Sequence, residues 1–251
     1  MRVLDHGSVT LVESWGSDER IVEAARMSTG KGFLGWGDDS PCQPGVGTEH
    51  VACKKGFHNC VVDHVIGDEK LLAFLWNNKH ATPFEMAGAV FEVQAPIFVF
   101  REWHRHRTQS YNEMSARYTP LPDVNYIPTV ERLMINAGTS NKQAGTVSGS
   151  AELTEYAAET FRGSLAYSYQ AAQELYESAL QAGVPKELAR VHLPVGRYSR
   201  MRASAVLRNW LGFLTLRMAP GAQWEIRQYA NAVHDLLQPL FPRTLALFDA
   251  T

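Results

Sequence analysis

The densest cluster of chemically versatile side chains in the sequence runs from Arg101 to Tyr118. Its sequence is REWHRHRTQSYNEMSARY, which contains four arginines, two histidines and two glutamates within eighteen residues. The planar guanidinium group of arginine binds two phosphate oxygens at once, and Ser115 and the backbone amides of a turn could complete such a site. The cluster therefore predicts an anionic ligand, such as a nucleotide or a flavin pyrophosphate.

Two other interpretations of this cluster have to be weighed. A charged segment is often the solvated face of a helix, in which Glu102 would pair with Arg105 or His106. The polar residue types here are mixed and follow no helical stripe, which argues against that interpretation. Basic segments also bind nucleic acid, but domains that do so usually carry net positive charge over a whole face. This chain has 24 Lys+Arg against 26 Asp+Glu, so a small anionic ligand fits better.

Other catalytic and metal-binding signatures are missing from the sequence. It contains no glycine-rich dinucleotide fingerprint, no phosphate-binding P-loop, no His-Glu-x-x-His and no Gly-x-Ser-x-Gly. His104 and His106 are two residues apart and have no third ligand nearby in the sequence, so no metal site is predicted there.

The cysteines form a separate group, Cys42, Cys53 and Cys60. An odd number of cysteines argues against a disulfide framework, so we expect reduced thiols in an inserted surface loop. His50 and His58 lie between them, and zinc prefers such ligands, but no Cys-x-x-Cys pair is present. A structural zinc site is therefore the alternative interpretation of this segment.

The pattern of apolar residues predicts the elements that must position these side chains. Strands are expected at Ser8–Ser14, Ala89–Val93 and Tyr198–Val206. Helices are expected at Asp18–Ala25, Gly67–Lys79, Ala151–Ala182, Pro185–Val191, Arg208–Arg217 and Gln223–Pro239. Gly183 should end the longest helix, and the helix at Gly67–Lys79 should bury Leu71, Leu72, Phe74 and Leu75. Long loops are expected at Gly30–Gly56 and Gly138–Ser150.

The whole chain has the composition of a soluble globular protein. Its 251 residues are 45% hydrophobic and 20% charged, which excludes a disordered chain. No apolar run reaches the roughly 20 residues of a membrane span, and the first residues lack the pattern of a signal peptide, so a cytoplasmic location is expected. No repeat or linker divides the chain. We therefore predict one domain, residues 1–251, with an insertion at about 30–63, in the α/β (α+β) class with few strands.

One family accounts for these motifs together. Arg105-His106-Arg107, followed by seven residues and Ser115, resembles the signature of the flavin-dependent thymidylate synthases. The similarity extends to the flanking sequences PIFVFREWHRHR, NEMSARY, HATPFE, ELARVHLP and FLTLR with AQWEI. It covers most of the chain except Gly30–Asp63 and the loop Gly138–Ser150.

The resemblance implies a fold and an activity. The fold would be a twisted, mostly antiparallel sheet flanked by helices, assembled as a homotetramer whose active sites are shared between subunits. The activity would be reductive methylation of dUMP to dTMP, with methylenetetrahydrofolate as the one-carbon donor, FAD as cofactor and NADPH as reductant. No nucleic acid and no membrane partner is expected.

The resemblance also implies the site residues. Arg217 would be catalytic, because a fixed cation beside the uracil ring stabilises the negative charge that develops there. FAD would contact His80, Thr82, Arg105, His106, Arg107, Glu113 and Arg208. The nucleotide would contact Glu102, Trp103, His104, Arg105, Glu113, Met114, Ser115, Ala116, Arg117, Arg190 and Arg217.

Three positions depart from the family pattern. Glu102 stands where the family has Gln, which adds a negative charge near the pyrimidine. Val206 and Gly212 stand where Asn residues often contact FAD, so Asn209 is a candidate to replace those contacts.

Alternatives to this activity remain open at this point. A related flavin-dependent methyltransferase could act on UMP or dCMP, and a non-catalytic nucleotide- or RNA-binding protein could use the same arginines. No covalent nucleophile is expected. Ser115 has no evident base in the sequence, and the cysteines lie outside every matched motif.

Overall fold

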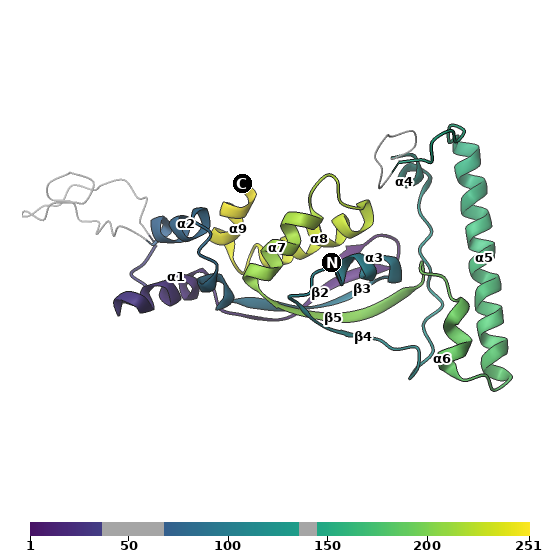
Figure 1. The fold of residues 1–251 in the computed structure, drawn as a ribbon, viewed down its shortest axis with the longest axis horizontal. Helices are drawn as coiled ribbons and strands as arrows, with labels where there is room; N and C mark the ends of the chain where they lie inside the picture. The colour runs from purple at the N-terminus through teal and green to yellow at the C-terminus, as the bar shows by residue number, and fades with distance from the viewer. Residues whose placement is uncertain (37–67, 136–144) are drawn as a thin grey trace, which may run out of the picture. The chain divides into compact units, whose positions relative to one another are not determined.

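The computed structural model describes residues 1–36, 68–135 and 145–251 (Figure 1). Most of the predicted insertion, with its three cysteines, and part of the loop Gly138–Ser150 lie outside these residues. The prediction of a single domain with an insertion therefore stays a prediction.

A five-stranded sheet runs through the described chain in the order β1-β2-β3-β5-β4. The strands are β1 (Arg2–Val3), β2 (Gly7–Trp15), β3 (Gly88–Pro96), β4 (Ser110–Glu113) and β5 (Tyr198–Val206). The β1–β2 and β4–β5 pairs are antiparallel. A mixed class with a mostly antiparallel sheet and helices is thereby confirmed. Strand β5 has the predicted bounds, whereas β4 was not predicted.

By packing, the described chain divides into two compact units. The first contains Met1–Val12, Phe91–Ser204 and Phe213–Val233, and the second contains Glu13–Val90, Ala205–Gly212 and His234–Thr251.

In the first unit, helix α3 (Ile97–Trp103) follows β3 directly, as Figure 1 traces. Pro96 lies before the first turn in extended backbone, where its missing N–H costs no helical hydrogen bond. The indole of Trp103 is fully buried, with its ring centroid 4.6 Å from that of Phe213. Its Nε1–H donates to Gln109 Oε1 at 3.0 Å, so the hydrogen-bonding group of this large core side chain is satisfied.

The first unit also contains α4 (Val130–Met134), the long α5 (Glu155–Gln181), and α6 (Lys186–Ala189), which leads into the 3-10 turn η3 (Arg190–His192). Helix α5 begins four residues later than predicted, because Thr154 caps it by accepting a hydrogen bond from the Ala157 amide at 3.2 Å. Gly183 follows the helix at φ +82°, which confirms its predicted role as the stop.

In the second unit, α1 (Asp18–Arg26) packs against α2 (Glu69–Asn77) and α9 (Pro242–Asp249). The buried Asp18 carboxylate accepts from the amides of Arg243 and Thr244, and so caps α9. On α2, Leu72 and Leu75 are buried as predicted. The prediction that Leu71 and Phe74 are buried with them was wrong, because Leu71 is half-buried and the Phe74 ring is 52% exposed and lies edge-on to His80.

Two helices have residues in both units, α7 (Leu207–Arg217) and α8 (Trp224–Leu237). Both were predicted to within one or two residues, since their apolar positions repeat at helical spacing. Among the helices that the structure describes, none has the length and hydropathy needed to cross a lipid bilayer.

Candidate functional site

The Arg101–Tyr118 segment is divided between a helix, a loop and an edge strand of the first unit. Its first residues end α3, and its centre forms a loop that returns to β4. The Tyr111 hydroxyl lies 2.7 Å from the His106 carbonyl oxygen and 3.2 Å from that of Trp103, so it holds the loop against the end of α3. Burial raises the pKa of Tyr111 to about 12, which keeps this hydroxyl protonated and able to donate.

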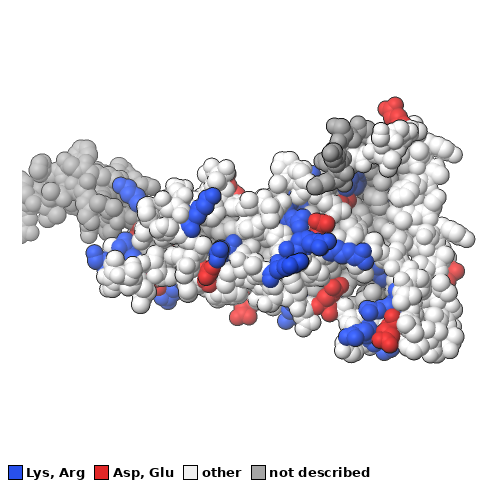
Figure 2. Space-filling view, in the orientation of Figure 1, with Lys and Arg blue, Asp and Glu red and all other residues white. Residues whose placement is uncertain are grey.

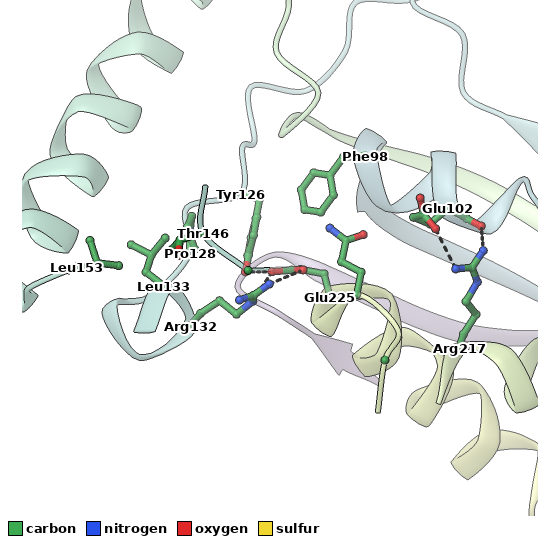
Figure 3. A pocket seen from close by; sticks show the side chains of 13 residues that line it. Phe98, Glu102, Tyr126, Pro128, Arg132, Leu133, Thr146, Leu153, Arg217 and Glu225 are labelled. Atoms are coloured by element: carbon green, nitrogen blue, oxygen red, sulfur yellow. Dashed lines mark hydrogen bonds and ion pairs between the residues drawn. The ribbon is translucent and has the colours of Figure 1, made fainter. Parts of the chain in front are cut away.

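Arg217, the predicted catalytic residue, meets this segment at the end of α7 (Figure 3). Its Nη1 donates to Glu102 Oε2 at 2.9 Å, and its Nη2 donates to the Glu102 carbonyl oxygen at 2.7 Å. Its Nε donates to His106 Nε2 at 2.9 Å. Three of the five N–H groups of the guanidinium are therefore committed, and two remain for a ligand.

His106 is neutral in this arrangement. Burial and the adjacent Arg217 charge lower the pKa of the imidazole from 6.5 to about 4, although the Glu102 carboxylate opposes the shift. A neutral imidazole that accepts at Nε2 carries its proton on Nδ1.

The Arg217–Glu102 pair lines a pocket of about 840 Å³ in the first unit, a volume that suits a small organic ligand. The wall is completed by Phe98, Tyr126, Pro128, Arg132, Leu133, Gly145, Thr146, Leu153, Gly221, Gln223 and Glu225.

A second charged cluster lies in the same pocket (Figure 3). The Arg132 guanidinium donates to both oxygens of Glu225, at 2.6 and 3.1 Å, and the Tyr126 hydroxyl donates to Glu225 Oε1 at 3.1 Å. The guanidinium also lies over the Trp224 ring, 5.4 Å from its centroid. Burial and the neighbouring carboxylate raise the pKa of Tyr126, so its hydroxyl stays a donor.

A smaller concave surface of about 300 Å³ is lined by Arg101, His104, Arg105 and Arg107. Figure 2 shows Lys and Arg atoms gathered on this face, over the region where Figure 1 draws α3. None of the ion pairs among the described residues involves Arg101, Arg105 or Arg107. Several cations around one hollow repel each other, and an anion bound there would relieve that repulsion.

The remaining nucleotide residues that the sequence predicted lie beyond α3 in the first unit. Glu113 ends β4 with an exposed side chain, and the Met114 amide donates to the Arg200 carbonyl oxygen at 2.8 Å. Ser115 begins a turn in which its hydroxyl accepts from the Arg117 amide at 3.3 Å, while Ala116 is buried and the Arg117 side chain is exposed. Arg190 begins η3 and is not among the described residues that line either cavity.

The other predicted flavin residues belong to the second unit. Thr82 begins the 3-10 helix η2 (Thr82–Glu85), two residues after the exposed His80. Arg208 forms an ion pair with Glu85, which joins the first turn of α7 to η2. Of the predicted flavin residues in the second unit, Arg208 is therefore linked to the turn that begins at Thr82.

Sequence reasoning missed four residues of this region. Arg101 precedes Arg105 by four positions on a helical end, and this spacing could have identified it. Tyr126, Arg132 and Glu225 gave no local signal, because the ion pair between Arg132 and Glu225 joins positions 93 residues apart.

Comparisons with known proteins agree on one family. The family model described as thymidylate synthase complementing protein matches residues 10–243. A flavin-dependent thymidylate synthase of Thermus thermophilus is 37% identical over 98% of this chain and 77% of its own length. That of Anaplasma marginale is 35% identical over 99% of this chain and 74% of its own length.

Two solved structures of the UMP/dUMP methylase PolB from Streptomyces cacaoi have the same fold. The one bound with 5-Br UMP has a TM-score of 0.75 and 29% identity, and covers 99% of this chain and 95% of its own. The one bound with 5-Br dUMP has a TM-score of 0.76 and 28% identity, and covers 100% and 97%. The family, the enzyme class and the flavin dependence expected from the motifs are confirmed: the chain belongs to the flavin-dependent thymidylate synthases, which are methyltransferases.

Proposed function

We propose that this protein converts dUMP to dTMP, using methylenetetrahydrofolate as the one-carbon donor, FAD as cofactor and NADPH as reductant. The observation that carries the proposal is the position of Arg217. Its guanidinium is fixed by three hydrogen bonds on the wall of a ligand-sized pocket, and it keeps two N–H groups for a ligand. Such a preorganised donor stabilises negative charge on a uracil ring more strongly than mobile water does.

The residues around the smaller hollow fit a flavin dinucleotide. Its pyrophosphate is a compact dianion, and the hollow is lined by Arg101, His104, Arg105 and Arg107, three arginines without a carboxylate partner among the described residues. When bound, the flavin would supply the hydride that reduces the transferred one-carbon unit. Arg105 and Arg107 would hold it electrostatically, while His80, Thr82, Arg208 and Glu113 remain proposed contacts by family resemblance.

The nucleotide residues are part of the same proposal. Ser115 would bind the nucleotide rather than attack it, because its hydroxyl accepts from the Arg117 amide and a serine needs a paired general base to become a nucleophile. The proposed contacts are Glu102, His104, Arg105, Glu113, Met114, Ser115, Ala116, Arg117, Arg190 and Arg217. The prediction that Trp103 contacts the nucleotide was wrong, because this residue is fully buried in the core and its Nε1–H already donates to Gln109.

A homotetramer with shared sites is also proposed. The position of Arg190 supports it, because among described residues Arg190 lines neither cavity of its own chain. A residue that serves the site of a neighbouring subunit would be placed in this way. We further propose that the enzyme works in the cytoplasm.

Tritium release tests the activity. Purified protein with FAD, NADPH and methylenetetrahydrofolate should release tritium from C5-labelled dUMP and form dTMP. Arg217→Ala should keep the fold and the flavin while losing turnover by on the order of 10²–10³. A folded, flavin-loaded protein that releases no tritium would contradict the proposal.

A second candidate substrate is UMP, because the two structural neighbours are described as UMP/dUMP methylases. Equal turnover of UMP and dUMP would favour a nucleotide methylase of broader specificity. Turnover of dUMP alone would favour the thymidylate synthase activity.

A further inference from the structure

We infer that His106 is a positioning residue for Arg217, whose Nε–H is held by the imidazole Nε2 so that the guanidinium presents its remaining N–H groups to the nucleotide. The inference deepens the proposed function and rests on it. The family resemblance places His106 against the flavin, whereas this geometry gives its Nε2 a different partner.

Three acceptor atoms surround the Arg217 guanidinium. Two of them come from Glu102, which binds Nη1 and Nη2 on one edge of the guanidinium. These two bonds leave the group free to tilt about that edge. The bond from Nε to His106 Nε2 at 2.9 Å comes from a third direction and stops the tilt.

The His106 imidazole is itself held in place by its neighbours. Its ring lies edge-on to the Phe213 ring, with centroids 4.9 Å apart, and Phe213 is fully buried. The backbone carbonyl oxygen of His106 accepts a hydrogen bond from the Tyr111 hydroxyl at 2.7 Å. His106 is therefore held through both its side chain and its backbone, so its Nε2 can keep the Arg217 guanidinium in one orientation.

The charge state of the His106 imidazole decides whether it can accept this hydrogen bond. A protonated ring could not accept at Nε2 and would place a second cation beside Arg217. Half-burial and the Arg217 charge keep the ring neutral at physiological pH. The neutral imidazole of histidine accepts through a ring nitrogen. A residue that replaces His106 must therefore place an acceptor atom at a similar distance from its backbone.

The test compares two variants of His106 in the FAD-loaded enzyme. His106→Leu removes the acceptor and should lower kcat, measured per bound FAD, by about 10- to 100-fold, with little change in the KM for dUMP. His106→Gln keeps an acceptor in its side-chain carbonyl and should recover most of that loss. His234→Leu is the control, since it removes a histidine that bonds Asp249 at 2.8 Å outside the site.

A double-mutant cycle separates positioning from general damage. If His106 acts through Arg217, adding His106→Leu to Arg217→Ala should cause no further loss of kcat. An additive loss of kcat per bound FAD would overturn the inference. If Arg217→Ala itself keeps full turnover, the proposed function of Arg217 fails first, so the two failures are distinguishable.

A spectroscopic measurement covers the case in which His106→Leu does not fold. In the unaltered ¹⁵N-labelled protein, a coupling across the hydrogen bond should join Arg217 Nε to His106 Nε2. The absence of this coupling, with the Arg217 Nε–H in fast exchange with water, would overturn the inference.

Discussion

At the scale of single residues, Arg217 has a carboxylate beside its guanidinium in the proposed nucleotide site. Glu102 places a carboxylate oxygen 2.9 Å from Arg217 Nη1. The hydrogen bond fixes the guanidinium, but the negative charge of the Glu102 carboxylate reduces the positive potential that Arg217 presents to an anion.

Glu102→Gln should therefore tighten dUMP binding. The amide oxygen of Gln can keep the hydrogen bond to Arg217, while one negative charge is removed from the pocket. A unit charge a few ångströms away at a partly solvated site corresponds to about 1 kcal/mol, or roughly fivefold in Kd. Calorimetric titration with dUMP would measure it, with Glu92→Gln as a control, because Glu92 pairs with Arg202 instead. Weaker binding in the Glu102 variant would contradict the prediction.

Arg101 should contribute to flavin retention although it lies outside the Arg-His-Arg motif. It lines the same hollow as Arg105 and Arg107 and has no carboxylate partner among the described residues. Arg101→Gln should weaken FAD binding several-fold and make it less sensitive to salt, because one cation fewer faces the pyrophosphate.

The measurement is the Kd for FAD at two salt concentrations. Arg202→Gln is the matched control, since Arg202 is an exposed arginine that already pairs with Glu92. If the two variants bound FAD equally well, Arg101 would have no part in the flavin site.

At the scale of elements, the pocket wall depends on one ion pair that joins α4 to α8. Arg132 comes from α4, and Glu225 comes from the first turn of α8 with only 3% of its surface exposed. Because α4 has five residues, it cannot be stable by itself. It relies on tertiary contacts, which include its packing against α5 and this ion pair.

Arg132→Ala should destabilise the protein by about 3–5 kcal/mol, because it leaves a buried carboxylate with the Tyr126 hydroxyl as its remaining partner. Replacing both partners, as in Arg132→Met with Glu225→Leu, should recover much of that loss. Urea unfolding would measure both. Arg20→Ala, which breaks an exposed pair with Glu23, should cost less than about 1 kcal/mol. An equal loss in Arg132→Ala and Arg20→Ala would refute this account.

At the scale of the whole molecule, the neutral His106 links folding to pH. The unfolded chain binds a proton on this imidazole below about pH 6.5, whereas the folded chain binds it only near pH 4. Stability should therefore rise as the pH increases between these values, by on the order of 1–2 kcal/mol when solvent screening is allowed for.

The measurement is the free energy of unfolding at pH 5 and pH 7 in the parent and in His106→Gln. The Asp18 carboxyl, whose pKa burial raises, contributes in the opposite direction and is common to both proteins. The difference between the two proteins in how the free energy of unfolding changes with pH gives the contribution of His106. Identical changes with pH would show that the imidazole is not held neutral.

The parts of the structure that the sequence predicts are those whose cause is local. Strand β5 alternates over nine residues, and α7 and α8 repeat their apolar positions at helical spacing, so their bounds followed from neighbours a few residues apart. The anion-binding motif was also visible, because its arginines are close in the chain.

Contacts between residues far apart in the chain depend on tertiary packing and could not be predicted from local patterns. Strand β4 has four residues with exposed or half-exposed side chains, so its sequence shows no alternating apolar pattern that would predict a strand. It forms because it pairs with β5. Arg217 and His106 are 111 residues apart, and their contact depends on how α7 packs against the end of α3. A local pattern of apolar residues predicts which face of a helix or strand is buried. It does not predict which other element packs against that face, because that contact depends on residues far away in the sequence.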